Sequence, residues 1–255
     1  MPRSPVVTSC VIIIGNEILS GRTQDTNLAH LARTLNEIGV RIVEARVIPD
    51  VEATIVATVN ECREKFDWVF TTGGIGPTHD DITADSIAKA FGVGIVQHPV
   101  IAETIRQREA PPEVMEMRLR MARTPEGATL IDNPTNGPQG FQIGNVLVMA
   151  GVPMVMQAMT STLTRERLGG GDPVRSRSIG AYLGESQVAR ELEEIQSRYP
   201  DVDLGSYPFY QKDGFGTNLV MRGTDEAELE RMREEVREMI VSFGAEPIAE
   251  TKKPA

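Results

Sequence analysis

Residues 67–83 have the sequence DWVFTTGGIGPTHDDIT, and this stretch decides the fold of the first half of the chain. Its apolar start, residues 68–72, predicts a buried strand, and a helix is expected to begin near Thr83. The three glycines at positions 73, 74 and 76 lack the side chains that would keep a bulky anion away from backbone N–H groups. The positive end of the following helix would lie at the same place. The stretch therefore predicts a strand–loop–helix unit that binds a phosphate.

Two adjacent carboxylates, Asp80 and Asp81, follow the glycines. A structural turn would explain the glycines alone, but it would not explain two like charges beside a phosphate. A divalent cation between the carboxylates and the phosphate oxygens would explain them, so we predict Asp80 and Asp81 as metal ligands. His79 lies in the same loop and would bind metal, donate to a phosphate or act as a general acid. The loop matches neither the dinucleotide fingerprint nor the lysine-containing loop of nucleoside triphosphatases.

Strand and helix patterns alternate over the first 150 residues. This order predicts right-handed crossovers and an α/β fold, a three-layer, mostly parallel sheet with helices on both faces. Ligands of such sheets bind beyond the carboxyl ends of the strands. The predicted strands are residues 6–14, 41–48, 68–72 and 145–149, and the predicted helices are residues 28–38, 55–66 and 84–91.

Further acidic residues follow the first two predicted strands. Glu17 comes after the first strand, Asp25 precedes the first helix and Asp50 comes after the second strand. Because the carboxyl ends of parallel strands meet at one edge, these residues are candidates to join Asp80 and Asp81. Asp25 and Asp50 each have an alternative role as a helix cap.

The rest of the sequence completes the first domain and predicts a second, small one. Residues 99–124 are expected to be helical, with methionines as core filler and a break at Pro111, and a further helix is expected from the turn at residues 151–153 to residue 168. The glycine run at residues 169–171 ends that pattern.

We predict a first domain over residues 1–170 and a small α+β domain over residues 174–250. Its predicted elements are strand 175–183, helix 185–198, strands 202–210 and 215–222, and helix 224–243, with Asp225 and Glu228 as a capping box. Because this unit is small, docking or a homo-oligomer, a dimer or a trimer, is expected.

Composition excludes several classes of partner. The formal net charge is -10, from 36 acidic and 26 basic side chains, and it disfavours nucleic acid and anionic membranes. The apolar run Cys10–Ile14 is too short for a membrane span or a signal peptide, so we expect a cytoplasmic protein. Cys10 and Cys62 lie in apolar patterns and are expected to be buried thiols. The three histidines have no zinc-binding spacing.

Three motifs together resemble a known family: GNEILSG at 15–21, DTN at 25–27 and TGGIGPTHDDIT at 72–83. The chain resembles the molybdopterin-binding (MoaB/MogA-like) domain of the competence/damage-inducible protein A (CinA) family, which is also fused to FAD synthases. The turn at 151–153 is similar to a family turn, and the small second domain is similar to the KH-like domain of CinA proteins. The resemblance implies substrate contacts from twelve positions: Gly15, Asn16, Asp25, Asn27, Thr72, Gly73, Gly74, Gly76, Thr78, His79, Gly151 and Pro153.

The resemblance also implies an activity, the metal-dependent cleavage of a pyrophosphate bond in an ADP-ribose- or FAD-like substrate, which releases AMP. The expected cofactor is a divalent metal (magnesium, cobalt or manganese), sometimes with potassium. N–H groups of residues 73–78 would bind one phosphate, Asp80 and Asp81 the metal, and Glu17 or Asp50 would accept a proton. Two alternatives stay open: a protein of molybdenum cofactor synthesis that binds pterin or nucleotide or transfers adenylate, and a non-catalytic nucleotide sensor. No amidase or FAD-forming domain resembles any part of the chain, so neither of those activities is expected.

Overall fold

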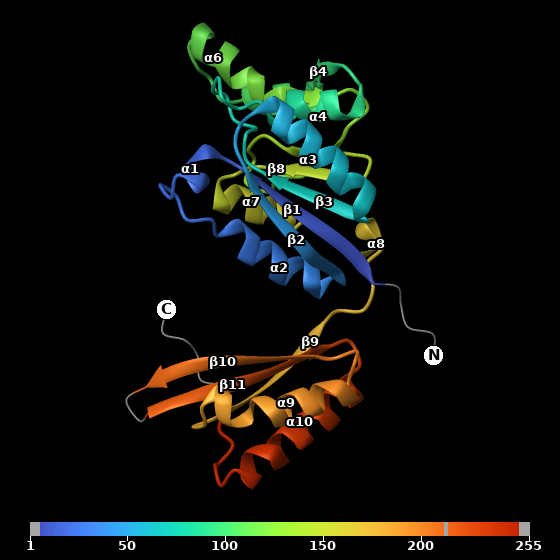
Figure 1. Ribbon diagram of the computed structural model, residues 1–255. Helices are drawn as coiled ribbons and strands as arrows, with labels where there is room; N and C mark the ends of the chain where they lie inside the picture. Colours follow the sequence, from blue (N-terminus) through green and yellow to red (C-terminus); the bar gives the residue numbers. More distant parts are fainter. Residues whose placement is uncertain (1–5, 212–213, 250–255) are drawn as a thin grey trace. The chain divides into compact units, whose positions relative to one another are not determined.

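The computed structural model describes residues 6–211 and 214–249. The chain divides into two compact units, with the boundary in the sequence between Asp172 and Pro173, and each is described by itself (Figure 1). Among the described residues, no helix has the length and apolar character needed to cross a membrane.

The first unit contains a six-stranded sheet in the order β2-β1-β3-β8-β7-β6. The first four strands in this order pair in parallel, whereas β7 is antiparallel to both β8 and β6. The strands are β1 (Val7–Ile14), β2 (Val40–Ile48), β3 (Trp68–Thr72), β6 (Thr129–Ile131), β7 (Gly140–Ile143) and β8 (Val146–Met149).

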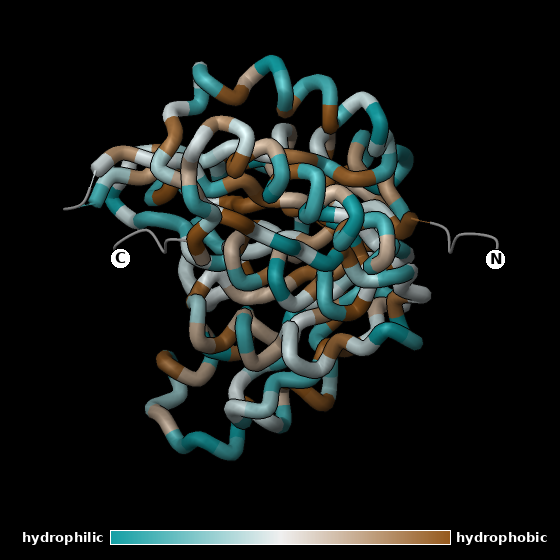
Figure 2. The backbone as a smooth tube through the Cα atoms, turned by 90° about the horizontal axis from the view of Figure 1, so that it is seen from below, coloured by the Kyte–Doolittle hydropathy of each residue, from teal (hydrophilic) through white to brown (hydrophobic). Residues whose placement is uncertain are grey.

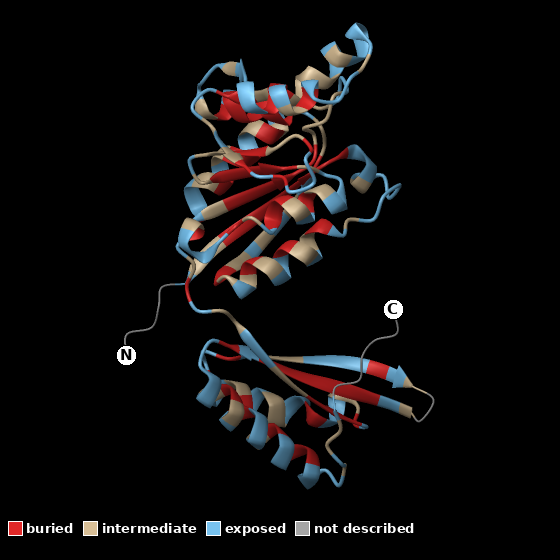
Figure 3. Cartoon of the chain, turned by 180° about the vertical axis from the view of Figure 1, so that it is seen from behind, coloured by how far each residue is buried: buried red, intermediate tan, exposed pale blue. Residues whose placement is uncertain are grey.

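Helices cover both faces of this sheet, as the alternating pattern predicts. Side chains of β1 alternate between two cores: Ile12 packs with α3 and α4 on one face, and Ile13 packs with α2 and α7 on the other. The central strands are buried and the outer helix faces are exposed (Figure 3). Apolar and polar residues alternate along the backbone tube (Figure 2). The helices are α1 (Asn16–Leu19), α2 (Asn27–Glu37), α3 (Glu52–Lys65), α4 (Thr83–Phe91), α7 (Pro153–Thr160) and α8 (Arg165–Leu168). The predicted three-layer α/β fold is therefore confirmed.

Residues 99–124 contain two helices separated before Pro112, which confirms the predicted break at Pro111, but residues 92–126 also contain two short strands and a 3-10 turn that the sequence did not predict. They form β4 (Ile95–Gln97), α5 (Pro99–Arg106), α6 (Pro112–Leu119), a 3-10 turn η1 (Arg120–Ala122) and β5 (Arg123–Pro125), and β4 pairs antiparallel with β5. A proline begins each of the two helices, because its fixed φ suits the first helical position and its missing N–H stops a preceding helix. The helix predicted up to residue 168 is likewise divided, since Thr164 caps α8 by accepting from the N–H of Arg167 at 3.2 Å.

The second unit is the α+β unit that the sequence predicts. Its elements are β9 (Arg175–Ala181), α9 (Glu185–Arg198), β10 (Asp203–Gln211), β11 (Gly214–Gly223) and α10 (Glu226–Ser242). The three strands form an antiparallel sheet in the order β10-β11-β9, and both helices share one core with it. Asp225 caps α10, because its Oδ1 accepts from the N–H of Glu228 at 3.0 Å.

Candidate functional site

Three strand ends of the first unit meet backbone to backbone. Gly73 follows β3 with φ of 103°, and a Cβ there would lie 2.1 Å from the carbonyl oxygen of Ile14, at the end of β1. A Cβ on Gly151, after β8, would lie 3.1 Å from the Cα of Gly73. Only glycine accepts this φ and this contact, so the sequence places the loops after β1, β3 and β8 together at the carboxyl edge of the sheet.

The glycine loop is fixed by its carbonyl groups. The N–H of Thr83 donates to the carbonyl of Gly74 at 3.0 Å, and the Thr83 hydroxyl donates to the carbonyl of Gly73 at 3.0 Å. The N–H of Gly73 donates to Met149 at 3.2 Å. The next three N–H groups, of Gly74, Ile75 and Gly76, have no acceptor among the residues that the structure describes. The loop therefore presents three consecutive unpaired donors beside the start of α4.

Asp80 and Asp81 meet at one threonine. Oδ2 of Asp81 accepts from the N–H of Thr78 at 2.8 Å, and the Thr78 hydroxyl lies 2.6 Å from both Asp80 Oδ1 and Asp81 Oδ2. The hydroxyl holds the pKa of the Asp80 carboxyl below its usual range, because it stabilises the ionised form. The second oxygen of each carboxylate accepts from no other described residue. His79 extends into solvent with 94% of its side chain exposed, and its Nδ1 lies 3.9 Å from Asp80 Oδ1.

Asp50 and Glu17 both lie at the loop after β1. Oδ2 of Asp50 accepts from the N–H of Asn16 at 2.8 Å, so Asp50 fixes this loop and places a negative charge at the start of α1. The Glu17 carboxylate lies over Gly15, where a Cβ would be 2.6 Å from Glu17 Oε1. The structure thus brings Asp50, Asn16, Glu17 and Gly15 together.

The start of α2 is tied to the turn after β8. The Asn27 amide donates to the carbonyl of Gly151 at 2.8 Å, just before Pro153 begins α7. Asp25 caps the helix, since its Oδ1 accepts from the N–H of Leu28 at 2.9 Å, which confirms the helix-cap alternative. The buried Asn27 Oδ1 has no hydrogen-bond partner, and neither does the buried hydroxyl of Thr72. Such orphaned polar atoms are typical of a site that a ligand or water completes.

These features coincide with a known domain. Residues 10–170 match the family model described as a probable molybdopterin binding domain. The chain belongs to this family. Residues 173–245 match the model of the FAD synthase middle domain, so the second unit has its own relatives.

Relatives of this molybdopterin-binding-type chain fall into two groups by length. A protein of Archaeoglobus fulgidus is 30% identical over 230 residues, which cover 90% of this chain and 96% of the relative. A CinA-like protein of Gemmatimonas aurantiaca is 34% identical over 78% of this chain and 50% of its own length. A probable FAD synthase of Caenorhabditis briggsae is 27% identical over 94% of this chain and 51% of its own length. The chain thus spans about half the length of the latter two.

A solved structure supports the same family. The crystal structure of protein CinA from Thermoplasma acidophilum is 31% identical, has a TM-score of 0.54, and is matched over 60% of this chain and 94% of that one. The resemblance drawn from the three motifs is therefore confirmed at the level of the family.

The donor set fits some metals and not others. No group of three or more His, Cys, Asp or Glu side chains that could hold a metal exists among the described residues, so Glu17, Asp25 and Asp50 do not join Asp80 and Asp81 in one cluster. Two carboxylates with free oxygens suit magnesium, which takes one or two carboxylates and completes its shell with water and substrate phosphate. They do not suit a closed zinc or calcium cage.

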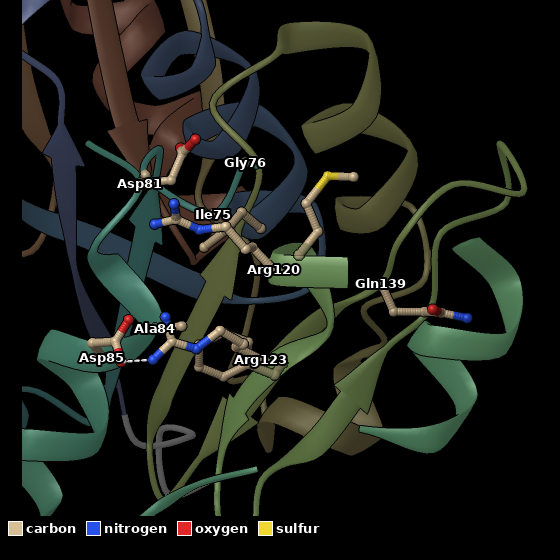
Figure 4. A pocket seen from close by; sticks show the side chains of 11 residues that line it. Ile75, Gly76, Asp81, Ala84, Asp85, Arg120, Arg123 and Gln139 are labelled. Atoms are coloured by element: carbon tan, nitrogen blue, oxygen red, sulfur yellow. Dashed lines mark hydrogen bonds and ion pairs between the residues drawn. The ribbon is translucent and has the colours of Figure 1, made fainter. Parts of the chain in front are cut away.

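A pocket adjoins the glycine loop of this molybdopterin-binding-type domain, and sequence reasoning missed most of its lining. Gly74–Gly76 and Asp81 form one wall, and Arg120, Arg123 and Gln139 approach from other segments (Figure 4). Arg123 forms an ion pair with Asp85 of α4. No sequence signal marked these residues, because arginines of the 92–126 segment resemble the solvent-exposed arginines of any helix.

Proposed function

We propose that the chain hydrolyses a pyrophosphate bond of an ADP-ribose- or FAD-like substrate with the help of a divalent metal, and releases AMP. The observation that carries the proposal is that one loop contains both kinds of group. It presents the three unpaired N–H groups of Gly74 to Gly76 together with the two free carboxylate oxygens of Asp80 and Asp81. Donors alone would bind an anion. Carboxylates next to them favour a metal-assisted reaction at phosphorus.

Each residue has a defined part in this proposal. The loop N–H groups would bind the non-bridging oxygens of one phosphate. Those of Gly74 and Ile75 lie in peptide planes that Thr83 already holds through the carbonyls of Gly73 and Gly74, so they need little rearrangement. Asp80 and Asp81 would hold the cation, which supplies polarisation of the phosphoryl oxygens when bound. Magnesium, manganese and cobalt are the candidates, with potassium as a possible second ion.

The proton of the attacking water needs an acceptor. Asp50 already accepts from Asn16, so its main part is to position the loop. Glu17 is exposed and lies over Gly15, next to the backbone that Gly73 contacts, so it is the better base. Attack of water oxygen on phosphorus would break the bond to the bridging oxygen, leave AMP and a second phosphate product, and transfer the water proton to Glu17.

The test is a direct assay of the purified full chain. ADP-ribose, FAD and NAD are each incubated with magnesium, manganese or cobalt, and AMP is measured by chromatography. Asp81→Asn keeps an oxygen that accepts from the Thr78 N–H, so the turn should persist while the charge is lost. We expect AMP formation to fall about 100-fold or more, because even indirect partners of a metal site are worth about 10- to 100-fold.

The matched control is Glu64→Gln, which removes one exposed negative charge from α3, away from the carboxyl edge. It should retain full activity. Absence of AMP from every substrate with the unaltered chain would refute the hydrolase proposal, and so would full activity in Asp81→Asn.

The family match itself favours a second candidate, binding of a molybdopterin-type pterin phosphate or a nucleotide without hydrolysis. The loop donors and the orphaned Asn27 and Thr72 oxygens would serve such a ligand equally well. Calorimetric binding of a pterin phosphate without any AMP formation would favour this candidate.

A further inference from the structure

Arg120 approaches the glycine loop from a distant segment of the chain. It is the first residue of η1, and in Figure 4 its guanidinium extends past Ile75 toward Asp81. The backbone behind it is well fixed, because Ala122 is fully buried in a cluster with Ile101 and Ile105, and its carbonyl accepts from the N–H of His98 at 2.7 Å. The position of Arg120 relative to the pocket is therefore determined by packing.

Arg120 differs from its neighbours in having no partner. Among the described residues, no carboxylate or carbonyl lies within hydrogen-bond reach of its guanidinium. Arg123, in the same pocket, is neutralised by Asp85, and Arg118 donates to the carbonyl of Arg108 at 3.2 Å. Arg120 is a residue of intermediate exposure that lines the pocket, and because its guanidinium has no acceptor it is available to an anionic ligand.

The carboxylate opposite Arg120 does not neutralise it. Asp81 is bonded to Thr78, and no ion pair within 4.0 Å joins Asp81 to Arg120. The pocket thus has unpaired N–H donors on one wall, at Gly74 and Gly76, and an unpaired cation that enters from another.

We propose that Arg120 binds a second phosphate, adjacent to the one on the glycine loop, so that the loop donors and Arg120 together favour a diphosphate-linked ligand over a monophosphate. This inference rests on the proposed phosphate-binding role of the loop, and it adds a residue that would distinguish a diphosphate from a monophosphate. A nucleoside diphosphate group satisfies both walls. A pterin monophosphate satisfies only the loop.

The experiment measures binding rather than turnover. Titration calorimetry with the full chain uses ADP and AMP as probes, each with and without magnesium. The variants are Arg120→Gln, Arg120→Lys and the control Arg118→Gln, which removes the same charge two residues earlier. Thermal unfolding of each variant checks that the fold is unchanged.

We expect the unaltered chain to bind ADP about 10- to 100-fold more tightly than AMP, which is the worth of one charge-assisted contact. Arg120→Gln should lose this preference and bind AMP within about threefold of the unaltered chain. Arg120→Lys should keep part of the preference, because it retains the charge but not the two-pronged geometry. Arg118→Gln should behave as the unaltered chain.

Two outcomes overturn the inference: equal loss of ADP and AMP affinity in Arg120→Gln, which would indicate a general charge effect, or no loss of either. The readout separates this inference from the proposed hydrolysis. A preference for ADP that disappears in Arg120→Gln would support the second-phosphate site even if no substrate yields AMP. AMP formation with no difference between ADP and AMP binding would retain the hydrolase and refute the role of Arg120.

Discussion

Replacement of Gly73 by alanine should destabilise the first unit far more than the same change at Gly21. Both glycines have positive φ, 103° and 72°, so each alanine incurs the cost of a left-handed conformation, about 1 kcal/mol. Only Gly73 also meets backbone, since its Cβ would lie 2.1 Å from the Ile14 carbonyl oxygen, whereas nothing lies within 4 Å of a Cβ on Gly21.

The steric part of the Gly73 effect can be estimated. A Cβ 2.1 Å from a carbonyl oxygen forces β1 and β3 apart, and such overpacking costs about 1–3 kcal/mol. We therefore expect a total near 3 kcal/mol for Gly73→Ala and near 1 kcal/mol for Gly21→Ala. With a urea dependence of about 2 kcal/mol per M, the midpoints should fall by about 1.5 M and about 0.5 M.

Tryptophan fluorescence reports on the first unit alone. Trp68 is the one tryptophan of the sequence, and its indole N–H donates to the carbonyl of Leu168 at 2.8 Å, within the same unit. Urea titrations of the full chain therefore measure the unit that contains both glycines. Equal midpoint shifts for Gly73→Ala and Gly21→Ala would refute the argument that the loops after β1 and β3 are in backbone contact.

Two further predictions concern groups outside the pocket. Burial raises the pKa of the Cys10 thiol to about 12, so at pH 8 about one Cys10 in 10⁴ is a thiolate, and Cys62 lies 3.6 Å from it with no exposed surface. A thiol reagent should therefore modify neither cysteine in the native protein and both cysteines in urea. Rapid modification without urea would contradict this prediction. The N–H and hydroxyl of Thr8 lower the pKa of Asp67, so its stabilising effect is present above about pH 4 and is lost as the pH falls through the folded-state pKa. Asp67→Asn should therefore lower the urea midpoint by about 0.2–0.5 M at pH 7, and this difference should shrink as the pH falls below about 4; a difference independent of pH would contradict the argument.

The elements that could be predicted from the sequence are the ones with a long enough pattern. β1 ends in a continuous apolar run, Cys10–Ile14, and α2 repeats apolar residues at helical spacing over eleven residues. Strands β6 and β7 were not predicted, because three or four residues contain no recognisable period and Gly140 begins β7 directly after a turn-rich segment. The four-residue α1 was missed for the same reason.

The candidate site likewise contains residues that could be predicted from the sequence and residues that could not. Gly73, Gly151 and Asp50 follow strands of one parallel sheet, so their position along the chain places them at its carboxyl edge, and the structure shows the backbone and side-chain contacts between those loops. Arg120 follows no such rule. Its place depends on how residues 92–122 fold back over α4, and that packing rests on contacts such as Ala122 with Ile101 that have no local signature.

The charge of the whole chain gives the local donors their importance. A net charge of -10 repels an anionic ligand at long range, so affinity for a phosphate has to come from short-range groups. These groups bind best if the folded structure already orders them, because binding then costs no further conformational entropy. The glycine loop meets this condition. The carbonyls of Gly73 and Gly74 accept hydrogen bonds from Thr83, and these bonds fix the orientation of the N–H groups that follow them. The same reasoning applies to Arg120, because an ion pair with Asp81 would have cancelled the one unpaired cation among the described residues that line the pocket. In the structure Asp81 instead accepts from the N–H and the hydroxyl of Thr78, and the guanidinium of Arg120 has no partner among the described residues, so this wall of the pocket is available to an anion.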